Sequence, residues 1–265
     1  MALIRAASAA LLASGAAATT GILLPLYVYP SAEFGDGAAN WRPAVDAMAA
    51  SAHVPWLAVV NPGNGPGPTG EPGNGDANYI AGVSQLNALA NVRPVGYVRT
   101  DYGASPAAEL YANITTWAGW AAYGGAEDVG VDGIFFDEAS AADLEYLRGA
   151  AAHARAAFGS KQIVTVCNFG AAAPAEAYAA GVCDVVVVFE SFLNDPAAPP
   201  YLGRATIDAN TPDGGDYGAE ADVALLGSYV REAADAGLGW LYFCSADYDS
   251  ITAAPATIGA LAAAF

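Results

Sequence analysis

Cations are scarce in this sequence. Nine lysine and arginine residues stand against 27 aspartates and glutamates, Lys161 is the only lysine, and the formal net charge is −18. A surface of this charge repels phosphate backbones, which argues against nucleic-acid binding. It would tolerate a polycationic partner, although an acidic coat that keeps the protein soluble is the simpler explanation.

The sequence also has few histidines, lysines or serines that could act as catalytic residues. His53 precedes a predicted strand and His153 lies within a predicted helix, which disfavours a histidine metal site or a histidine general base. Lys161 begins a predicted strand, so no lysine is left for Schiff-base chemistry. No serine occupies a nucleophile-elbow motif. We therefore expect no metal and no cofactor.

The three cysteines allow one disulfide at most. Cys167 falls near the C-terminal end of one predicted strand, and Cys183 precedes the next. Parallel neighbours hold such ends roughly a strand length apart, farther than the about 7 Å between Cα atoms that a disulfide permits. The sequence therefore predicts no disulfide. Cys167 and Cys244 approach the functional strand ends but lack an activating histidine, so we expect buried free thiols.

No apolar stretch after residue 20 is long enough to cross a membrane without a glycine, proline or charge. Residues 1–20 have the features of a secretory signal: a weakly positive start, an alanine-rich apolar run over 6–18, and small residues at 16–18. The alternative is an N-terminal helix that the mature protein keeps. We expect residues 1–20 to be a signal peptide or N-terminal extension, residues 21–265 to form one domain, and the protein to be secreted or at the cell surface.

The remaining chain is rich in apolar residues, and strand-like and helix-like segments alternate along it. Strands are predicted at 21–30, 55–62, 92–100, 131–138, 162–169, 184–191, 204–210 and 239–247. Helices are predicted at 41–52, 78–90, 106–123, 141–158, 174–181, 222–237 and 252–265. Eight such strands, hydrophobic on both faces, predict an α/β fold with a single (β/α)8 TIM barrel. The prolines between the sixth and seventh strands leave little room for a helix there.

The segment 62–75 is dense in glycine, proline and asparagine and predicts a long loop after the second strand. Its spaced glycines do not form a dinucleotide-binding motif, because Pro66 and Pro68 interrupt them. A long loop after a barrel strand is a candidate for part of a binding site.

The strand at 131–138 ends in two adjacent acids, Asp137 and Glu138. Carboxylates at a buried strand end are costly to keep without a use, although Asp137 could simply cap the next helix. In such barrels the working groups lie at the C-terminal strand ends. The polar residues predicted there are Tyr27, Tyr29, Asn61, Arg99, Asp101, Tyr102, Asp137, Glu138, Asn168, Glu190, Asp208 and Asp247.

This set offers carboxylates and tyrosines, and glycoside hydrolysis is chemistry that two carboxylates perform alone. Asp137 and Glu190 end the fourth and sixth strands, so we expect them to converge as nucleophile and acid/base, about 5–6 Å apart as in retaining enzymes. Glu138 is expected to orient Asp137 or the substrate, and crowding of the three acids to raise at least one pKa. Tyrosine rings near the rim would bind sugar faces.

Five segments in this order resemble the spherulin-4-like, spherulation-specific family of glycoside hydrolases. They are Pro-Leu-Tyr-Val-Tyr-Pro (25–30), Val-Asn-Pro (60–62), Val-Gly-Tyr-Val-Arg-Thr-Asp-Tyr (95–102), Gly-Ile-Phe-Phe-Asp-Glu (133–138) and Val-Val-Phe-Glu (187–190). The resemblance implies a barrel, essential acids at Asp137, Glu138 and Glu190, and endo-cleavage of galactosaminogalactan-like, α-1,4-linked N-acetylgalactosamine. Apart from the polysaccharide we expect no partner, and the protein to be a monomer. Some family members are known only as stage-specific proteins, so a non-catalytic glycan-binding wall or spore-coat protein is the alternative. Retention of all three acids favours the enzyme.

Overall fold

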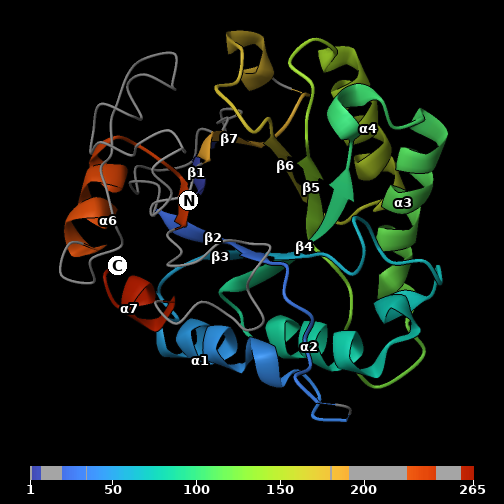
Figure 1. Ribbon diagram of the computed structural model, residues 1–265, viewed down its shortest axis with the longest axis vertical. Helices are drawn as coiled ribbons and strands as arrows, with labels where there is room; N and C mark the ends of the chain where they lie inside the picture. The colour runs from blue at the N-terminus through green and yellow to red at the C-terminus, as the bar shows by residue number, and fades with distance from the viewer. Residues whose placement is uncertain (1, 7–19, 34, 180, 191–225, 243–257) are drawn as a thin grey trace.

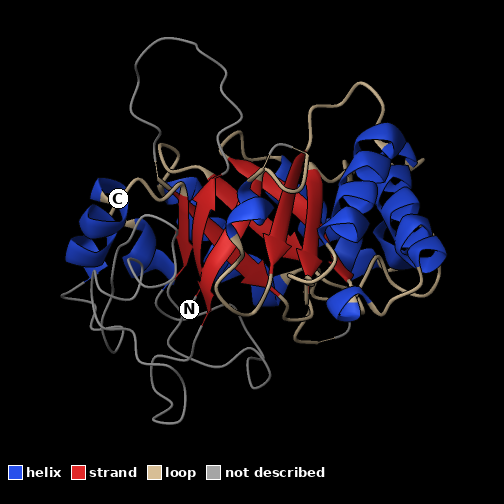
Figure 2. Cartoon of the chain, turned by 90° about the horizontal axis from the view of Figure 1, so that it is seen from above, coloured by secondary structure: helices blue, strands red, loops and turns tan. Residues whose placement is uncertain are grey.

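The computed structural model describes residues 2–6, 20–33, 35–179, 181–190, 226–242 and 258–265. They form an α/β fold in which a curled sheet occupies the centre and helices lie around its outside (Figures 1 and 2). The strands are β1 (Ala2–Ala6), β2 (Gly21–Leu26), β3 (Trp56–Val60), β4 (Val92–Arg99), β5 (Gly133–Asp137), β6 (Val164–Asn168), β7 (Val185–Glu190) and β8 (Trp240–Tyr242). The α-helices are α1 (Arg42–Ala50), α2 (Ala77–Asn87), α3 (Ala107–Gly119), α4 (Leu144–Ala157), α6 (Leu226–Asp235) and α7 (Ile258–Ala262).

Short 3-10 helices follow several strands and helices. They are η1 (Ala39–Trp41), η2 (Pro72–Gly75), η3 (Asp101–Gly103), η4 (Trp120–Ala122) and η5 (Ala175–Tyr178). None of the helices described here is both long and apolar enough to span a bilayer.

The parallel part of the sheet contains seven strands in the order β7-β6-β5-β4-β3-β2-β8. This confirms the predicted α/β class and the curled parallel sheet, but not the full set of eight βα units. The predicted strand at 204–210 and the proline-containing segment before it lie outside the described residues. Between β7 and β8 the sheet contains β1, which pairs antiparallel with both.

The strand β1 was not expected from the sequence. Residues 1–20 were predicted to be a signal peptide or an extension, with a retained N-terminal helix as the alternative. Ala2–Ala6 forms strand pairs with both edges of the parallel sheet. Most of the alanine-rich run, to which the helical alternative applies, lies outside the described residues, so that alternative stays a prediction. Cleavage of a signal stays a prediction.

Buried side chains form two layers, one inside the curled sheet and one between the sheet and its helices. The inner layer contains Leu23, Leu57, Val59, Val95, Tyr97, Phe135, Val164, Val166, Val185 and Val187. In the outer layer Trp117 of α3 and Trp120 of η4 are fully buried, so both indole rings belong to the core. Trp117 can lie directly on β4 because Gly96 has no side chain: a Cβ there would be 2.3 Å from the indole ring.

Cys167 and Cys183 form a disulfide, with Cα atoms 5.9 Å apart, so the prediction of no disulfide is wrong, as is the expectation of a free thiol at Cys167. The error lay in assuming that β6 and β7 start at the same level. Val185, the first residue of β7, pairs with Val166 in the middle of β6. Cys183 is therefore offset from Cys167 by only three residue positions along the sheet. The chain just before β7 stays beside β6, since the Asp184 amide donates to the Thr165 carbonyl at 2.9 Å, and both cysteines are buried in the same core layer. Cys244 lies outside the described residues.

Candidate active site

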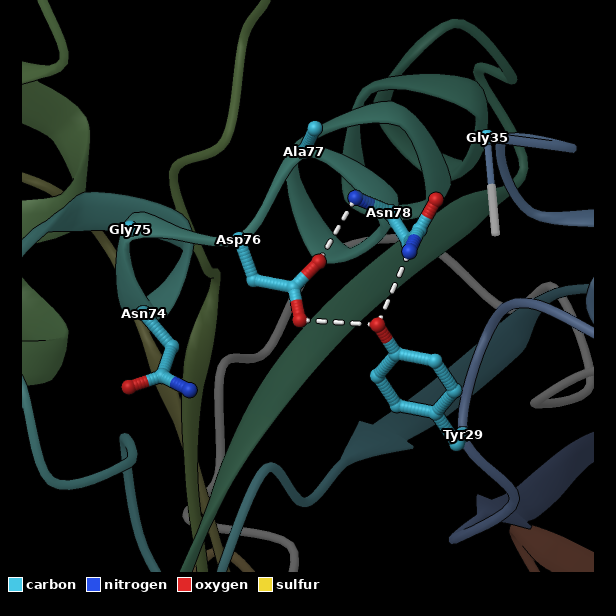
Figure 3. A pocket seen from close by; sticks show the side chains of 7 residues that line it. All are labelled: Tyr29, Gly35, Asn74, Gly75, Asp76, Ala77 and Asn78. Carbon is cyan, nitrogen blue, oxygen red and sulfur yellow. Dashed lines mark hydrogen bonds between the residues drawn. The ribbon is translucent and has the colours of Figure 1, made fainter. Parts of the chain in front are cut away.

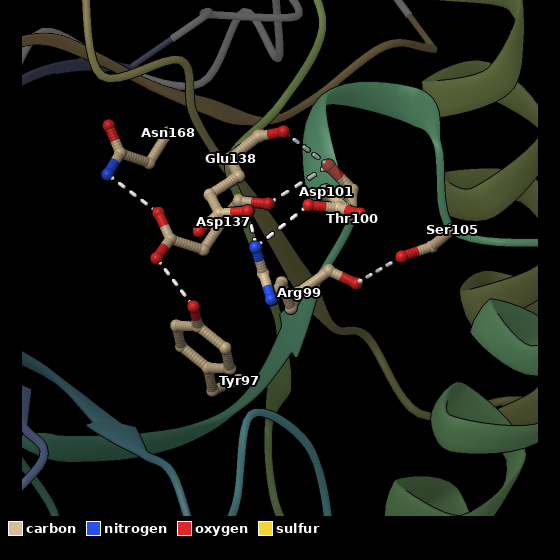
Figure 4. Close-up of polar contacts among 8 residues, drawn as sticks. All are labelled: Tyr97, Arg99, Thr100, Asp101, Ser105, Asp137, Glu138 and Asn168. Carbon is tan, nitrogen blue, oxygen red and sulfur yellow. Dashed lines mark hydrogen bonds and ion pairs between the residues drawn. The ribbon is translucent and has the colours of Figure 1, made fainter.

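Both carboxylate oxygens of Asp137 accept hydrogen bonds from neighbouring strands at the C-terminal rim of the sheet. The hydroxyl of Tyr97 on β4 donates to Oδ2 at 2.6 Å, and the amide of Asn168 on β6 donates to Oδ1 at 2.8 Å (Figure 4). Tyr97 and Asn168 are themselves buried, whereas Asp137 is half-buried. Three adjacent strands thus fix the position of one carboxylate.

Burial is the main cause of a raised pKa at Asp137. The hydrogen bonds from Tyr97 and Asn168 oppose this effect because they stabilise the ionised form, while the charge of Glu138 raises the pKa further. A raised pKa among the crowded acids was predicted, but desolvation contributes more to it than crowding does. Burial and the charge of Asp137 also raise the pKa of Tyr97, so its hydroxyl stays protonated and remains a donor.

The backbone after β5 turns sharply at Glu138, whose φ is +52°. Thr100 fixes this turn, since its hydroxyl donates to the carbonyls of Asp137 at 2.9 Å and Glu138 at 2.7 Å. The amide of Tyr102 also donates to the Glu138 carbonyl at 2.7 Å. A left-handed conformation costs a non-glycine residue about 1–3 kcal/mol and is found preferentially at functional sites. The next helix, α4, is capped by the side chain of Asp143. The capping role considered for Asp137 is therefore wrong.

Arg99 holds the side chains of two acids beside Asp137. Its Nε lies 2.7 Å from Oε2 of Glu138, and its Nη2 lies 2.8 Å from Oδ1 of Asp101 (Figure 4). Glu138 thus has its charge paired, whereas the two side chains that donate to Asp137, Tyr97 and Asn168, are both neutral. The two adjacent acids have different environments, which is the usual basis for different roles in catalysis.

The structure brings together most of the residues predicted for the site. Asn168 donates to Asp137, Arg99 pairs with Glu138 and Asp101, and Thr100 joins these two groups into one network through the Asp137 and Glu138 carbonyls. Tyr102 follows this network with 61% of its surface exposed. Tyr27 joins the network through its ring, which lies edge-on to that of Tyr97 with centroids 5.5 Å apart.

Two other predicted residues lie farther along the rim. Asn61 follows β3, and its side-chain oxygen is buried without a hydrogen-bond partner among the described residues. Tyr29 is bonded to Asp76 and Asn78 at the start of α2, not to the carboxylate network.

Glu190 ends β7, and only β6 separates β7 from β5 in the sheet. Its side chain lies outside the description, so the separation of the Asp137 and Glu190 carboxyls stays a prediction. Asp208 and Asp247 also lie outside the described residues. Within the described part of the chain, no group of three or more histidine, cysteine or acidic side chains is placed to hold a metal ion.

Sequence reasoning missed the roles of Tyr97 and Thr100. Tyr97 was read as part of a buried strand, yet the alternation Val95, Tyr97, Arg99 places it on the inner face, one step below the rim. That alternation could have predicted its approach to Asp137. Thr100 acts through backbone carbonyls, for which the sequence carries no signal.

The fold and the site define a class: a TIM-barrel-like α/β protein with a carboxylate-centred site at the C-terminal rim of its sheet. Residues 21–210 match the spherulation-specific family 4, Spherulin4, and the chain belongs to that family.

A curated relative, Spherulin-4 of Physarum polycephalum, is 38% identical over 124 residues. This match covers 47% of the chain and 31% of the relative's length, so the chain spans about a third of that protein. Among solved structures, the crystal structure of Aspergillus clavatus Sph3 in complex with GalNAc is similar, with a TM-score of 0.72 and 25% identity. That similarity covers 93% of this chain and 97% of the other.

Proposed function

We propose that this protein is a secreted, endo-acting glycoside hydrolase that cleaves an amino-sugar polysaccharide, of the galactosaminogalactan type with α-1,4-linked N-acetylgalactosamine. The observation that carries the proposal is the environment of Asp137: a half-buried carboxylate at the strand rim, with both oxygens oriented by neutral donors and its pKa raised by burial. Family membership supports it, as does the similarity to Sph3, which was crystallised with GalNAc.

In the proposed retaining mechanism, the Asp137 carboxylate attacks the anomeric carbon while the Glu190 carboxyl group protonates the departing glycosidic oxygen. The bond to the leaving sugar breaks as the covalent glycosyl–Asp137 ester forms. Glu190, now ionised, then accepts a proton from water, which attacks the anomeric carbon and releases Asp137. Each group ends in its starting protonation state.

The neighbouring residues position these two acids and the sugar. Tyr97 and Asn168 hold the plane of the Asp137 carboxylate and favour its ionised, nucleophilic form. Glu138, fixed by Arg99, orients the substrate at the rim. Tyr27, whose ring contacts Tyr97, and the exposed Tyr102 offer ring surfaces next to this network.

The alternative is a non-catalytic glycan-binding protein of a cell wall or spore coat. A binding protein has no need of a half-buried carboxylate whose ionised form is disfavoured by desolvation, because neutral amides and hydroxyls bind sugars without that penalty. The state of Asp137 therefore favours the enzyme.

A reducing-sugar assay on galactosaminogalactan, with chitin and starch as comparison substrates, tests the proposal. Wild-type protein should release reducing ends from the first polymer, and Asp137→Asn and Glu190→Gln should each abolish release while still binding it. Asp143→Asn is the matched control, since it changes a carboxylate at the start of α4 and should leave activity intact. Binding without hydrolysis by the wild type would favour the alternative, and near wild-type turnover in either acid variant would refute the carboxylate pair.

A further inference from the structure

A pocket of about 430 Å³ lies apart from the carboxylate network (Figure 3). Its lining consists of Tyr29, Gly35, Asn74, Gly75, Asp76, Ala77 and Asn78. Tyr29 stands three residues beyond the end of β2. Asn74, Gly75 and Asp76 belong to the connection between β3 and α2, and Ala77 and Asn78 are the first residues of α2. Both segments follow C-terminal strand ends, so the pocket opens on the same rim of the sheet as Asp137.

The polar groups of this pocket are fixed before any ligand arrives. The Tyr29 hydroxyl donates to Oδ2 of Asp76 at 2.9 Å and accepts from the Asn78 amide at 2.8 Å. Asp76 is also the N-cap of α2, because its Oδ1 accepts from the Asn78 backbone at 2.8 Å. The Tyr29 ring rests edge-on against Tyr79 with centroids 5.5 Å apart, and Asn40 bonds the Tyr29 carbonyl at 3.0 Å.

The chemistry of the lining fits a neutral, polyhydroxylated ring. The Tyr29 side chain is 44% exposed although it is held rigidly, so an aromatic face is kept available to a ligand. Beside it stand one carboxylate and two side-chain amides, which accept from and donate to hydroxyl groups. The seven lining residues include no arginine or lysine, which disfavours a phosphate or carboxylate ligand. A pyranose ring combines the required apolar face with a hydroxylated edge.

We propose that this pocket is an outlying subsite that binds one pyranose unit of a polysaccharide whose scissile bond lies at Asp137, an inference that rests on the proposed function. Tyr27 lies on the path between the two sites: it is two residues from Tyr29, and its ring contacts Tyr97, which bonds Asp137. Two strands separate β2 from β5, and at a spacing of 4.7–4.9 Å per strand the sites lie about 15 Å apart along the sheet. A sugar in the pocket is therefore not adjacent to the cleaved bond, and only a longer chain reaches both sites.

The test compares short and long substrates, a trisaccharide and an octasaccharide of α-1,4-linked N-acetylgalactosamine, in wild type, Tyr29→Ala and Asp76→Asn. Loss of the stacked ring should lower kcat/KM for the octasaccharide about tenfold, with the trisaccharide unchanged. Asp76→Asn keeps a residue that can cap α2. It should lower kcat/KM for the octasaccharide by a smaller factor and leave the trisaccharide unchanged. Asp143→Asn, which changes the corresponding cap of α4, should change neither substrate.

Binding separates this inference from the proposed hydrolysis. In an Asp137→Asn background, isothermal titration should show about tenfold weaker octasaccharide binding when Tyr29→Ala is added. An equal loss for both lengths, or none, would overturn the subsite while leaving the hydrolase standing. If the wild-type protein cleaves neither oligosaccharide, the proposed hydrolase activity is wrong. A loss of octasaccharide binding in Tyr29→Ala would even then support the proposed subsite. If Tyr29→Ala does not fold, Asp76→Asn and Asn78→Ala test the subsite in its place: each should weaken octasaccharide binding and leave trisaccharide binding unchanged.

Discussion

The phenol oxygen of Tyr97 lies 2.6 Å from Oδ2 of Asp137, although the two residues are not register partners. Tyr97 pairs with Phe135, two positions earlier on β5, and their rings stack with centroids 6.0 Å apart. The long tyrosine side chain therefore rises inside the sheet from one layer of side chains to the next. Its hydroxyl reaches the carboxylate from below and leaves the rim side of Asp137 to the substrate.

Replacing Tyr97 with phenylalanine should weaken catalysis without disturbing the fold. The ring contacts with Tyr27 and Phe135 remain, but the hydrogen bond to a charged partner is lost, which corresponds to about 10- to 100-fold in kcat. Because that bond lowers the pKa of Asp137, its removal should raise this pKa and move the acid limb of the pH–activity profile to higher pH. The profile of kcat/KM against pH measures the shift.

Tyr146→Phe is the control for this change, since the Tyr146 hydroxyl donates to the backbone carbonyl of Ser105 at 2.8 Å and is not one of the side-chain donors to Asp137. It should leave the acid limb in place. A Tyr97→Phe enzyme with an unshifted acid limb would contradict the assignment of Tyr97 to the control of Asp137.

Asp137→Asn should stabilise the protein at neutral pH. Folding raises the pKa of Asp137, so the protonated form is the one that the fold favours. The stabilisation is complete below the unfolded pKa and is lost as the pH rises through the folded pKa. Asparagine imitates the protonated form at every pH. Its Tm should exceed that of the wild type at pH 7, and the difference should vanish as the pH falls below about 3.8.

Glu138→Gln provides the contrast in the same thermal scans. It removes the ion pair with Arg99 across 2.7 Å, a partly exposed pair of the kind that contributes about 0–1 kcal/mol. Its Tm at pH 7 should be equal to or lower than that of the wild type. An Asp137→Asn protein that melts below the wild type at pH 7 would show that the carboxylate stabilises the fold, against the desolvation argument.

The sequence was sufficient to predict which strand ends meet. Hydrophobic runs closed by Arg99, Asp137 and Asn168 identified three neighbouring strands, and parallel pairing then required their polar ends to lie together. The features that could not be predicted from the sequence depend on the register between neighbouring strands and on contacts between residues far apart in the chain. The offset of β7 against β6 brought Cys183 to Cys167, and no local pattern encodes such an offset.

Two other features depended on the same kind of non-local information. An alanine-rich N-terminus is compatible with a signal peptide, and only the open edges of β7 and β8 explain why Ala2–Ala6 forms a strand. Tyr29 was predicted to contact the substrate, but its partner Asp76 lies 47 positions away. Gly73 and Asn74 are residues that favour the left-handed turns found before Asp76, yet no local pattern pairs Asp76 with Tyr29.

The disulfide should be detectable as missing thiols. Of the three cysteines, only one should react with Ellman's reagent in denaturant without reductant, and three after reduction. The bond closes a loop of 16 residues, so its loss through a Cys167→Ser/Cys183→Ser double change should cost about 3 kcal/mol in the free energy of unfolding. Urea unfolding of the double variant measures the loss. Three reactive thiols in the unreduced protein would contradict the pairing.

The stereochemical outcome follows from one distance that remains a prediction, the gap between the carboxyl groups of Asp137 and Glu190. β5 and β7 flank β6, and residues that end strands so close together lean over the same opening. Retaining enzymes hold their carboxyls about 5–5.5 Å apart, whereas inverting enzymes need about 6.5–9.5 Å to admit a water. Glu138 cannot be the distant partner, because it adjoins Asp137 in sequence and is paired with Arg99.

Proton NMR of the first product should therefore show the anomeric configuration of the substrate. Azide should rescue Asp137→Asn with a product of inverted configuration, and an inverted first product from the wild type would overturn the retaining mechanism while leaving the glycosidase assignment intact.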